Sequence, residues 1–74
     1  MNYLNHISSS HQVMLGKPVI KGTRVTVEII LKKLSEGATV NDISSLYTIT
    51  LEDVYATLLY ASNVIATEEV INTK

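Results

Sequence analysis

The sequence predicts a mostly α-helical domain, a trihelical bundle of the helix-turn-helix type that follows a short N-terminal β-hairpin or β-arm. The chain has 74 residues, which is enough for one small core and too few for two. Turn-forming glycine and proline residues concentrate in residues 16–24, and three consecutive helix patterns follow that segment. The whole chain, 1–74, is therefore expected to form a single domain.

Four segments are expected within this domain. Residues 1–11 are polar and serine-rich, which predicts a loose N-terminus. Residues 12–25 are expected to form the β-arm, residues 26–62 the three-helix bundle, and residues 63–74 a helical tail.

The β-arm is predicted from two short apolar runs and the turn between them. Residues 12–15 favour a short strand, and residues 16–18 favour a turn because proline fixes its own φ and biases the preceding residue toward extended geometry. Val19 and Ile20 favour a second strand, which Gly22 closes. Two strands this close predict a hairpin. An isolated hairpin is marginal in water, so it needs to pack on the helices or on another subunit.

The first helix is predicted over residues 27–36. Thr26 is a favourable N-cap, and the apolar residues after it recur at the i, i+3, i+4 and i+7 spacing of an amphipathic helix. Glu28 near the start and two lysines near the end suit the helix dipole. Gly37 is placed to end the helix in the left-handed conformation.

The second helix is predicted over residues 40–47. Thr39 and Asp42 before it resemble a capping box. Residues 48–50 then form a tight connection to the next helix. A short helix, a three-residue turn and a longer helix match the helix-turn-helix unit, in which the first helix serves as the supporting third helix.

The third helix begins with a second capping box, formed by Thr50 and Asp53. It either ends near Asn63, with one more short helix after Thr67, or continues without a break. Its inward side is predicted at the following positions: Leu51, Val54, Tyr55, Leu58, Leu59 and Ser62. Tyr60 lies off that predicted side, and we expect it to anchor an interface because tyrosine joins an apolar ring to a polar hydroxyl.

The net charge of −1 conceals a polarised chain. Residues 1–34 carry five cations and one carboxylate, a net +4, whereas residues 35–74 carry one cation and six carboxylates, a net −5. Such a chain can present an anion-binding face and a cation-binding face at once. Ordinary solvated surface charge explains the same pattern equally well.

The positive charge of the arm makes it the first candidate for binding nucleic acid or a partner. The candidate residues are Lys17, Lys21, Gly22, Thr23 and Arg24. They precede the N-terminus of the first predicted helix, where free backbone N–H groups also favour anions. A structural interpretation is equally good: the glycine serves a tight turn, and the arginine pairs with a carboxylate such as Glu28.

The third helix is a poor candidate for groove binding. In a helix-turn-helix unit its N-terminal end normally enters the major groove, and here that end carries Glu52 and Asp53. These carboxylates would lie where the phosphates lie, whereas duplex binding needs cations. A trihelical scaffold without standard groove docking is therefore the better interpretation.

The C-terminal tail is the second candidate for binding. Its apolar residues stand between carboxylates, which is the pattern of an amphipathic segment laid into a partner's groove. The candidate interface residues are Tyr60, Val64, Ile65, Val70 and Ile71. The hydrophobic content is 46%, and neither a disulfide nor a metal site is expected to stabilise so small a core. A homodimer is therefore also expected, formed through strands or through helices.

Several function classes are disfavoured by composition. His6 and His11 have no carboxylate near them in the sequence and there is no cysteine, so we predict no catalytic residue, no cofactor, no metal site and no enzyme. The segment 16–24 is not a Walker loop, because that motif ends in Gly-Lys-Ser/Thr, whereas here the lysine follows Gly16 and Gly22 is followed by Thr23. No apolar run approaches the roughly 20 residues of a membrane span, and no secretory signal is apparent. A cytoplasmic protein without a membrane partner is expected.

The arm also contains a recognisable signature. Residues 16–20, Gly-Lys-Pro-Val-Ile, followed by residues 22–25, Gly-Thr-Arg-Val, resemble the GKPxIxGTR motif of domain-of-unknown-function family 433, a VapB-like antitoxin family of bacteria and archaea. The resemblance covers about residues 7–62. Further matches are Gly37, the spacing of Ile43 and Tyr47, Leu51-Glu52-Asp53 and Tyr60-Ala61.

The resemblance implies a homeodomain-like helical fold with a short N-terminal β element, commonly dimeric. The signature residues in this chain are Gly16, Pro18, Gly22, Thr23 and Arg24. Where the family often has a proline after the tyrosine that ends the second helix, this chain has Thr48, which leaves the following turn less rigidly specified.

The resemblance further implies an antitoxin that stands beside a PIN-like nuclease toxin. The expected function is therefore that of an antitoxin-like protein of a type II toxin–antitoxin module, which binds a PIN-like toxin through its acidic C-terminal part and DNA through its basic arm. The alternative is a helix-turn-helix DNA-binding transcriptional regulator without a toxin partner.

Overall fold

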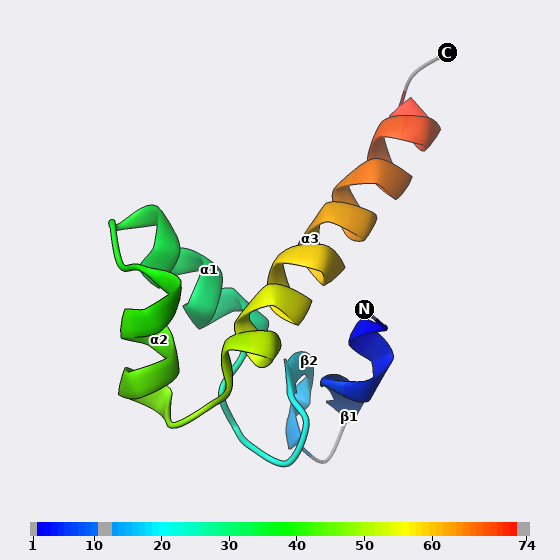
Figure 1. The fold of residues 1–74 in the computed structure, drawn as a ribbon. Helices are drawn as coiled ribbons and strands as arrows, with labels where there is room; N and C mark the ends of the chain where they lie inside the picture. Colours follow the sequence, from blue (N-terminus) through cyan, green and yellow to red (C-terminus); the bar gives the residue numbers. More distant parts are fainter. Residues whose placement is uncertain (1, 11–12, 73–74) are drawn as a thin grey trace.

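The computed structural model describes residues 2–10 and 13–72, which form three α-helices and a two-stranded antiparallel sheet (Figure 1). The elements in chain order are η1 (Tyr3–Asn5), β1 (Ile7–Ser10), β2 (Val13–Ile20), α1 (Val27–Ser35), α2 (Val40–Tyr47) and α3 (Leu51–Asn72). The predicted class, mostly α-helical with a short N-terminal β element, is confirmed at this level. In Figure 1, α1 and α2 lie on one side of α3, and the N-terminal segment lies on the other.

The sheet forms from other segments than those predicted. Residues 13–15 and 19–20, from the two predicted strands, belong to one strand, β2, and its partner β1 lies within 1–11, a segment predicted to be loose. Ile7 of β1 pairs with Ile20 of β2, and both side chains are buried. A single buried residue in a polar, serine-rich segment produces no periodicity. The sequence therefore carried no strand signal there, and the predicted strand pairing was wrong, whereas the expected short antiparallel β element at the N-terminus is present.

A bulge interrupts the pairing of the two strands. Ser9 of β1 pairs with Pro18 of β2, and the next residue of β1, Ser10, pairs with Val13. Residues 14–17 of β2 therefore lie between two neighbouring pairs and form the bulge. Leu15 and Gly16 take the positive φ angles 56° and 87° at this point. The predicted turn is therefore a bulge within β2, and glycine suits one of its two left-handed positions.

The loop after β2 fixes the start of α1. The Thr23 N–H donates to the Ile20 carbonyl at 3.0 Å, and Gly22 takes the positive φ of 81° at the third position of this turn. The Ile20 N–H in turn donates to the Val25 carbonyl at 2.9 Å. Thr26 then bridges to β2 and, as the N-cap, accepts a hydrogen bond from the first turn of α1.

The first two helices match their predictions closely. α1 ends at Ser35, so Glu36, predicted as its last residue, is its C-cap, and Gly37 follows with a φ of 104°. α2 has the predicted bounds. Its capping box is complete, because Thr39 and Asp42 exchange hydrogen bonds of 2.9 and 3.0 Å.

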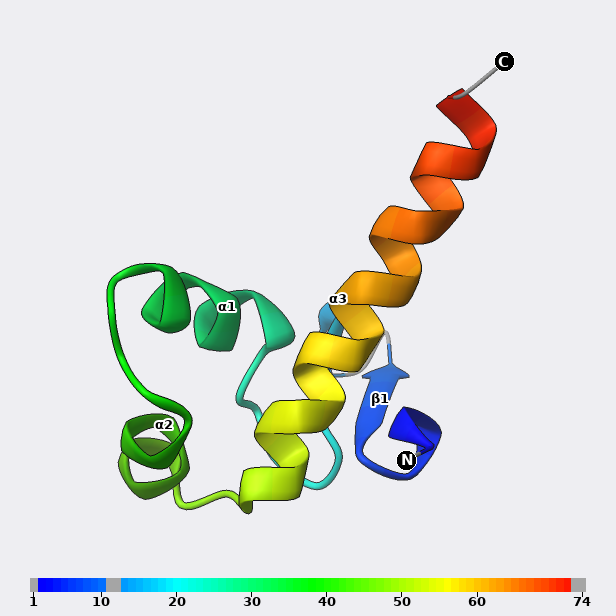
Figure 2. The same cartoon turned by 45° about the horizontal axis from the view of Figure 1, so that its top comes forward.

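α3 is one continuous helix. It passes Asn63 without a break, so the second of the two alternatives left open by the sequence is correct. Its capping box is also complete, since Thr50 and Asp53 exchange two hydrogen bonds of 3.0 Å. The C-terminal part of α3 extends away from the other elements (Figure 2) and accounts for the 42 Å length of the molecule.

The inward side of α3 differs from the predicted one. Of the six predicted positions only Val54 is buried, whereas Tyr55 and Leu58 are 50% and 40% exposed. Thr57 is fully buried instead, and Tyr60, predicted to lie off the inward side, packs partly against the core. The middle of α3 carries no charge, so no polar face in the sequence indicates which side faces water.

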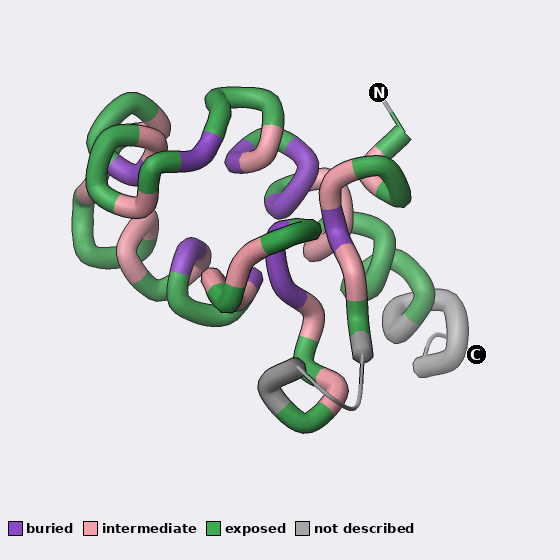
Figure 3. The backbone as a smooth tube through the Cα atoms, turned by 90° about the horizontal axis from the view of Figure 1, so that it is seen from below, coloured by how far each residue is buried: buried purple, intermediate pink, exposed green. Residues whose placement is uncertain are grey.

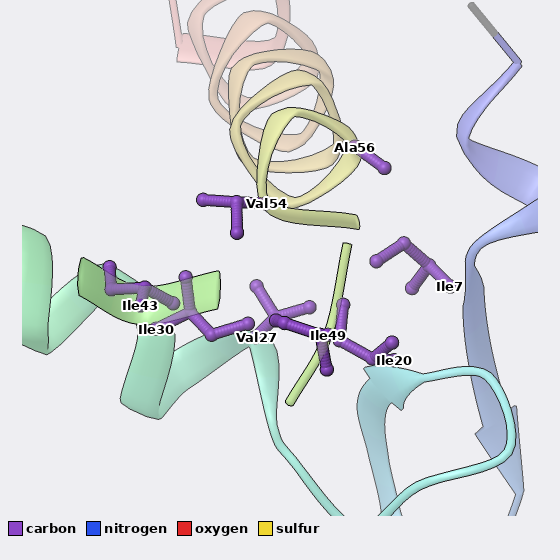
Figure 4. Close-up of a cluster of buried hydrophobic side chains, with 8 residues drawn as sticks. All are labelled: Ile7, Ile20, Val27, Ile30, Ile43, Ile49, Val54 and Ala56. Carbon is purple, nitrogen blue, oxygen red and sulfur yellow. The ribbon is translucent and has the colours of Figure 1, made fainter. Parts of the chain in front are cut away.

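The core lies where the sheet meets the three helices, and the buried residues gather there (Figure 3). Thr57 is buried among them, and its hydroxyl donates to the Asp53 carbonyl at 3.1 Å, so this polar group is satisfied. Figure 4 shows the clustered apolar side chains: Ile7, Ile20, Val27, Ile30, Ile43, Ile49, Val54 and Ala56.

Candidate interaction surfaces

The basic side chains of the arm are exposed, but two of them are held by other groups. Lys17 Nζ lies 3.2 Å from Glu28 Oε1, and Lys21 Nζ donates to the Leu4 carbonyl at 3.3 Å. Arg24 is exposed, and none of the carboxylates that the structure describes pairs with it. The interpretation that pairs Arg24 with Glu28 is therefore wrong, because Lys17 occupies that carboxylate.

Arg24 adjoins an open hollow of about 540 Å³. The hollow is lined by Ser8, Val19, Gly22, Thr23 and Arg24. The Thr23 hydroxyl is already engaged, since it donates to the Ile20 carbonyl at 2.7 Å and accepts from the Val25 N–H at 3.0 Å. Gly22 and Thr23 therefore shape the loop, and Arg24 is the residue at this hollow that offers a charge to an anion.

The start of α3 offers no cation to a nucleic acid. Leu51, Glu52 and Tyr55 are exposed there, and the Asp53 carboxylate is directed into the fold. From 51 to 67 the helix contains no lysine or arginine. This agrees with the prediction that α3 is a poor candidate for docking into a DNA groove, because phosphate contacts need cations.

Asp53 joins the N-terminal segment to α3. One carboxylate oxygen lies 2.8 Å from His6 Nδ1, and the other accepts the Thr50 N–H at 3.0 Å. Partial burial raises the pKa of the Asp53 carboxyl, but the hydrogen bonds from His6 and Thr50 outweigh it and hold the pKa below its ordinary value. The expectation that His6 has no carboxylate nearby is therefore wrong, since its partner is 47 residues away in sequence.

A second contact fastens the same segment. The Tyr3 ring meets the Tyr60 ring edge to face, with centroids 5.6 Å apart and planes at 82°. Tyr3 and His6 thus hold η1 and the start of β1 against α3 at two points. Sequence reasoning missed both contacts, because neither pair shares a local spacing or motif.

An apolar groove of about 240 Å³ lies between α1 and the middle of α3. It is lined by Val27, Leu31, Tyr60, Ala61, Val64 and Ile65. Three of the predicted interface residues, Tyr60, Val64 and Ile65, therefore come together on one surface. The side chains of the other two, Val70 and Ile71, lie outside the described residues.

Val64 and Ile65 are 42% and 55% exposed, and every residue from 62 to 67 is exposed. This stretch of α3 therefore leaves the body of the domain while it still carries large apolar side chains. The groove and the projecting helix are continuous through Val64 and Ile65.

The described part of the chain has neither a candidate metal cluster nor a helix suited to crossing a bilayer. Within it, no three His, Cys, Asp or Glu side chains are grouped so that they could hold a metal ion. None of its helices has the length and apolar character that crossing a bilayer requires.

Comparison with known proteins identifies one family. The model of DUF433, described as a protein of unknown function, matches residues 7–61, which include the arm, the groove-lining part of α1 and the first half of α3. No curated protein and no solved structure matches the chain.

Proposed function

The chain belongs to the DUF433 family, whose function is unknown, and we propose from its own surfaces that it is a non-enzymatic, antitoxin-like protein. It acts in the cytoplasm as the antitoxin of a type II toxin–antitoxin module and binds a PIN-like nuclease. The contact is made by the groove between α1 and α3 and by the projecting part of α3. The single observation behind this proposal is the run of exposed apolar side chains on a helix that leaves the domain.

A projecting helix that carries apolar side chains is a common means of protein recognition. Its apolar side chains enter a hydrophobic groove of the partner, and the anchors recur at helical spacing. Val64 and Ile65 follow Tyr60 and Ala61 at a spacing of four residues, and the groove that these four line extends the apolar surface onto Val27 and Leu31 of α1.

The charge of the C-terminal half suits a nuclease as the partner. Residues 35–74 carry a net charge of −5, and Glu68 and Glu69 lie within α3 beyond the exposed anchors. A protein that handles nucleic acid presents a basic surface to its substrate. An acidic helix laid over that surface would compete with the substrate for it, which is how an antitoxin of this kind would silence its toxin.

We expect the tagged chain, expressed together with the products of its neighbouring genes, to retain one of them in fixed stoichiometry and to suppress its nuclease activity. Val64→Asp places a charge on the apolar contact surface and is expected to weaken retention at least roughly tenfold, as for a buried interface anchor. Asn63→Asp is the matched control, because Asn63 is exposed on the same helix but does not line the groove. Retention should survive it.

Two results would count against the antitoxin role. One is that no neighbouring product co-purifies with the full chain. The other is that a product is retained equally by wild type, by Val64→Asp and by a chain that lacks residues 63–74.

Arg24 favours DNA binding by the arm as a second candidate function. Arg24 is exposed at the hollow, and Lys21, also exposed, precedes it by three residues in the same loop. We propose that α1, α2 and α3 form a homeodomain-like helix-turn-helix scaffold on which the arm, rather than α3, contacts phosphates. Without a toxin partner, the same chain would act as a DNA-binding transcriptional regulator.

DNA binding by the arm predicts a steep dependence on salt. The affinity for a duplex taken from upstream of its own gene should fall linearly on a plot of log K against log salt. Arg24→Ala should reduce that slope by roughly one unit, the loss expected for one phosphate contact. Lys32→Ala is the control, since Lys32 is a cation on α1 that lies near Glu36, outside the arm. Absence of binding at low salt, or equal slopes for both variants, would exclude the arm as the DNA-binding element.

A further inference from the structure

α3 carries a second apolar face that no other element of the described chain covers. Its residues are Leu51, Tyr55, Leu58, Ser62 and Ile65, and we call this set the α3 stripe. All five are exposed, the four apolar ones by 40–55%. The stripe is distinct from the buried side of the helix, which presents Val54, Ala56 and Thr57 to the core.

The spacing of the α3 stripe is that of a coiled-coil seam. Successive members are separated by four, three, four and three residues, an average of 3.5, which keeps a row of side chains facing a second helix along its length. A helix that packs only against its own globular core needs a single apolar side. Residues 54–67 contain no charged residue, so α3 is apolar on both its buried side and its outer side.

We infer that the α3 stripe is the homodimer interface, where α3 of one copy packs against α3 of a second copy. A seam of this spacing requires a partner helix with the same spacing, and a second copy supplies it by necessity. The contact is then isologous and closed, so it ends at two copies. The uncharged stretch 54–67 also places no like charges in the centre of such a contact, and the carboxylates of α3 lie towards its two ends.

The exposed area agrees with the needs of a stable dimer. At about 200 Å² for a fully exposed large side chain, the four apolar members present roughly 350–400 Å² per copy. A standard interface buries about 800 Å² per partner, of which roughly 60% is apolar. The α3 stripe thus supplies most of the apolar area that such an interface needs.

Analytical ultracentrifugation of the full chain over a range of concentrations tests this inference. We expect the wild type to dimerise and Leu58→Lys, at the centre of the α3 stripe, to raise the dimer dissociation constant at least roughly tenfold. Asn63→Lys puts the same charge on an exposed position outside the stripe and should leave the constant unchanged. Far-UV circular dichroism should show the same helix content in all variants.

A variant that is expected to strengthen the dimer gives a second test, which does not depend on disrupting the interface. Ser62 is the only polar member of the α3 stripe, so Ser62→Leu completes the seam and should lower the dissociation constant at least roughly tenfold. A chain that stays monomeric even with Ser62→Leu overturns the inference. So does a dimer that Leu58→Lys leaves intact or that Asn63→Lys weakens equally.

The inference and the proposed function share one residue, Ile65, which lines the groove and belongs to the α3 stripe. Leu58 and Ser62 do not line the groove, and Val64 is not part of the stripe, so Val64→Asp is expected to weaken toxin retention while the dimer remains. Failure of one proposal is therefore distinguishable from failure of the other.

Discussion

Replacing Ile30 with alanine is expected to lower the free energy of unfolding by about 3–4 kcal/mol, within the range for large-to-small changes at fully buried sites. Ile30 has no exposed surface and lies in the middle of the core cluster, beside Ile43 in Figure 4. The substitution removes three buried carbons and leaves a cavity, because the surrounding side chains belong to separate helices and relax only partly. A domain of this size has roughly 4–11 kcal/mol of stability in total. Ile30→Ala should therefore leave a marginal fold.

Thermal unfolding followed by circular dichroism at one protein concentration measures this effect, which corresponds to roughly 12–32 °C in Tm for a domain of 60–100 residues. Ile29→Ala is the matched control, since it makes the same chemical change one residue earlier on α1 at a position that is 37% exposed. It should cost less than about 1 kcal/mol. Equal losses for the two variants would contradict the assignment of Ile30 to the core.

Local signals explain why α1 and α2 could be predicted so closely. Thr26 and Thr39 accept hydrogen bonds from the first turns of their helices, and Gly37 has the positive φ that ends α1. These interactions join residues within four positions of each other, so the sequence displays them directly.

The errors in the sheet and in α3 have a different physical origin. β1 depends on Ile7, which meets Ile20 only after the chain has folded back. The orientation of α3 depends on which of two apolar sides meets the core, and the uncharged middle of the helix, residues 54–67, has no charged face to decide it. Tyr55 and Leu58 were therefore predicted to be buried, and they belong instead to the exposed α3 stripe.

The candidate surfaces also differ in whether they depend on local or on long-range features of the sequence. Arg24 could be selected from the sequence because a charge in a turn is visible there, and the structure leaves it exposed. The groove could not be found in this way, since Val27 and Leu31 lie in one helix and Val64 in another. The contact of His6 with Asp53 could not be predicted for the same reason, because the two residues are 47 positions apart in the sequence.

Replacing Asp53 with alanine is expected to cost about 2–3 kcal/mol, from the loss of one capping interaction and one charge-assisted hydrogen bond. The Asp53 carboxylate caps α3 through the Thr50 N–H and also holds His6 at 2.8 Å. Its removal should free the N-terminal segment from the start of α3 and leave Tyr3 with Tyr60 as the remaining side-chain contact between η1 and α3 that the structure records.

The variant Asp42→Ala measures the loss of a capping box alone. Comparison with it therefore separates the capping role of Asp53 from its contact with His6. Asp42 occupies the same position in the capping box of α2 and exchanges the same pair of hydrogen bonds with Thr39, but it is exposed and has no histidine partner. We expect Asp42→Ala to destabilise the protein distinctly less than Asp53→Ala. The difference should disappear when both variants are made in a His6→Ala background, because the histidine contact is then absent from each. An undiminished difference would mean that Asp53 stabilises the fold through some other contact.

The pH dependence gives the same contact a second test. The pKa of Asp53 is held below its ordinary value of 3.8, so the native state binds its proton more weakly than the unfolded state does. The stabilisation is therefore fully present above that ordinary value and is lost as the pH falls through the lowered native pKa. The loss of stability in Asp53→Ala, measured by urea unfolding, should be largest near neutral pH and should shrink below about pH 3.8. A loss that stays constant down to pH 2 would show that the ionised carboxylate does not hold the N-terminal segment to α3.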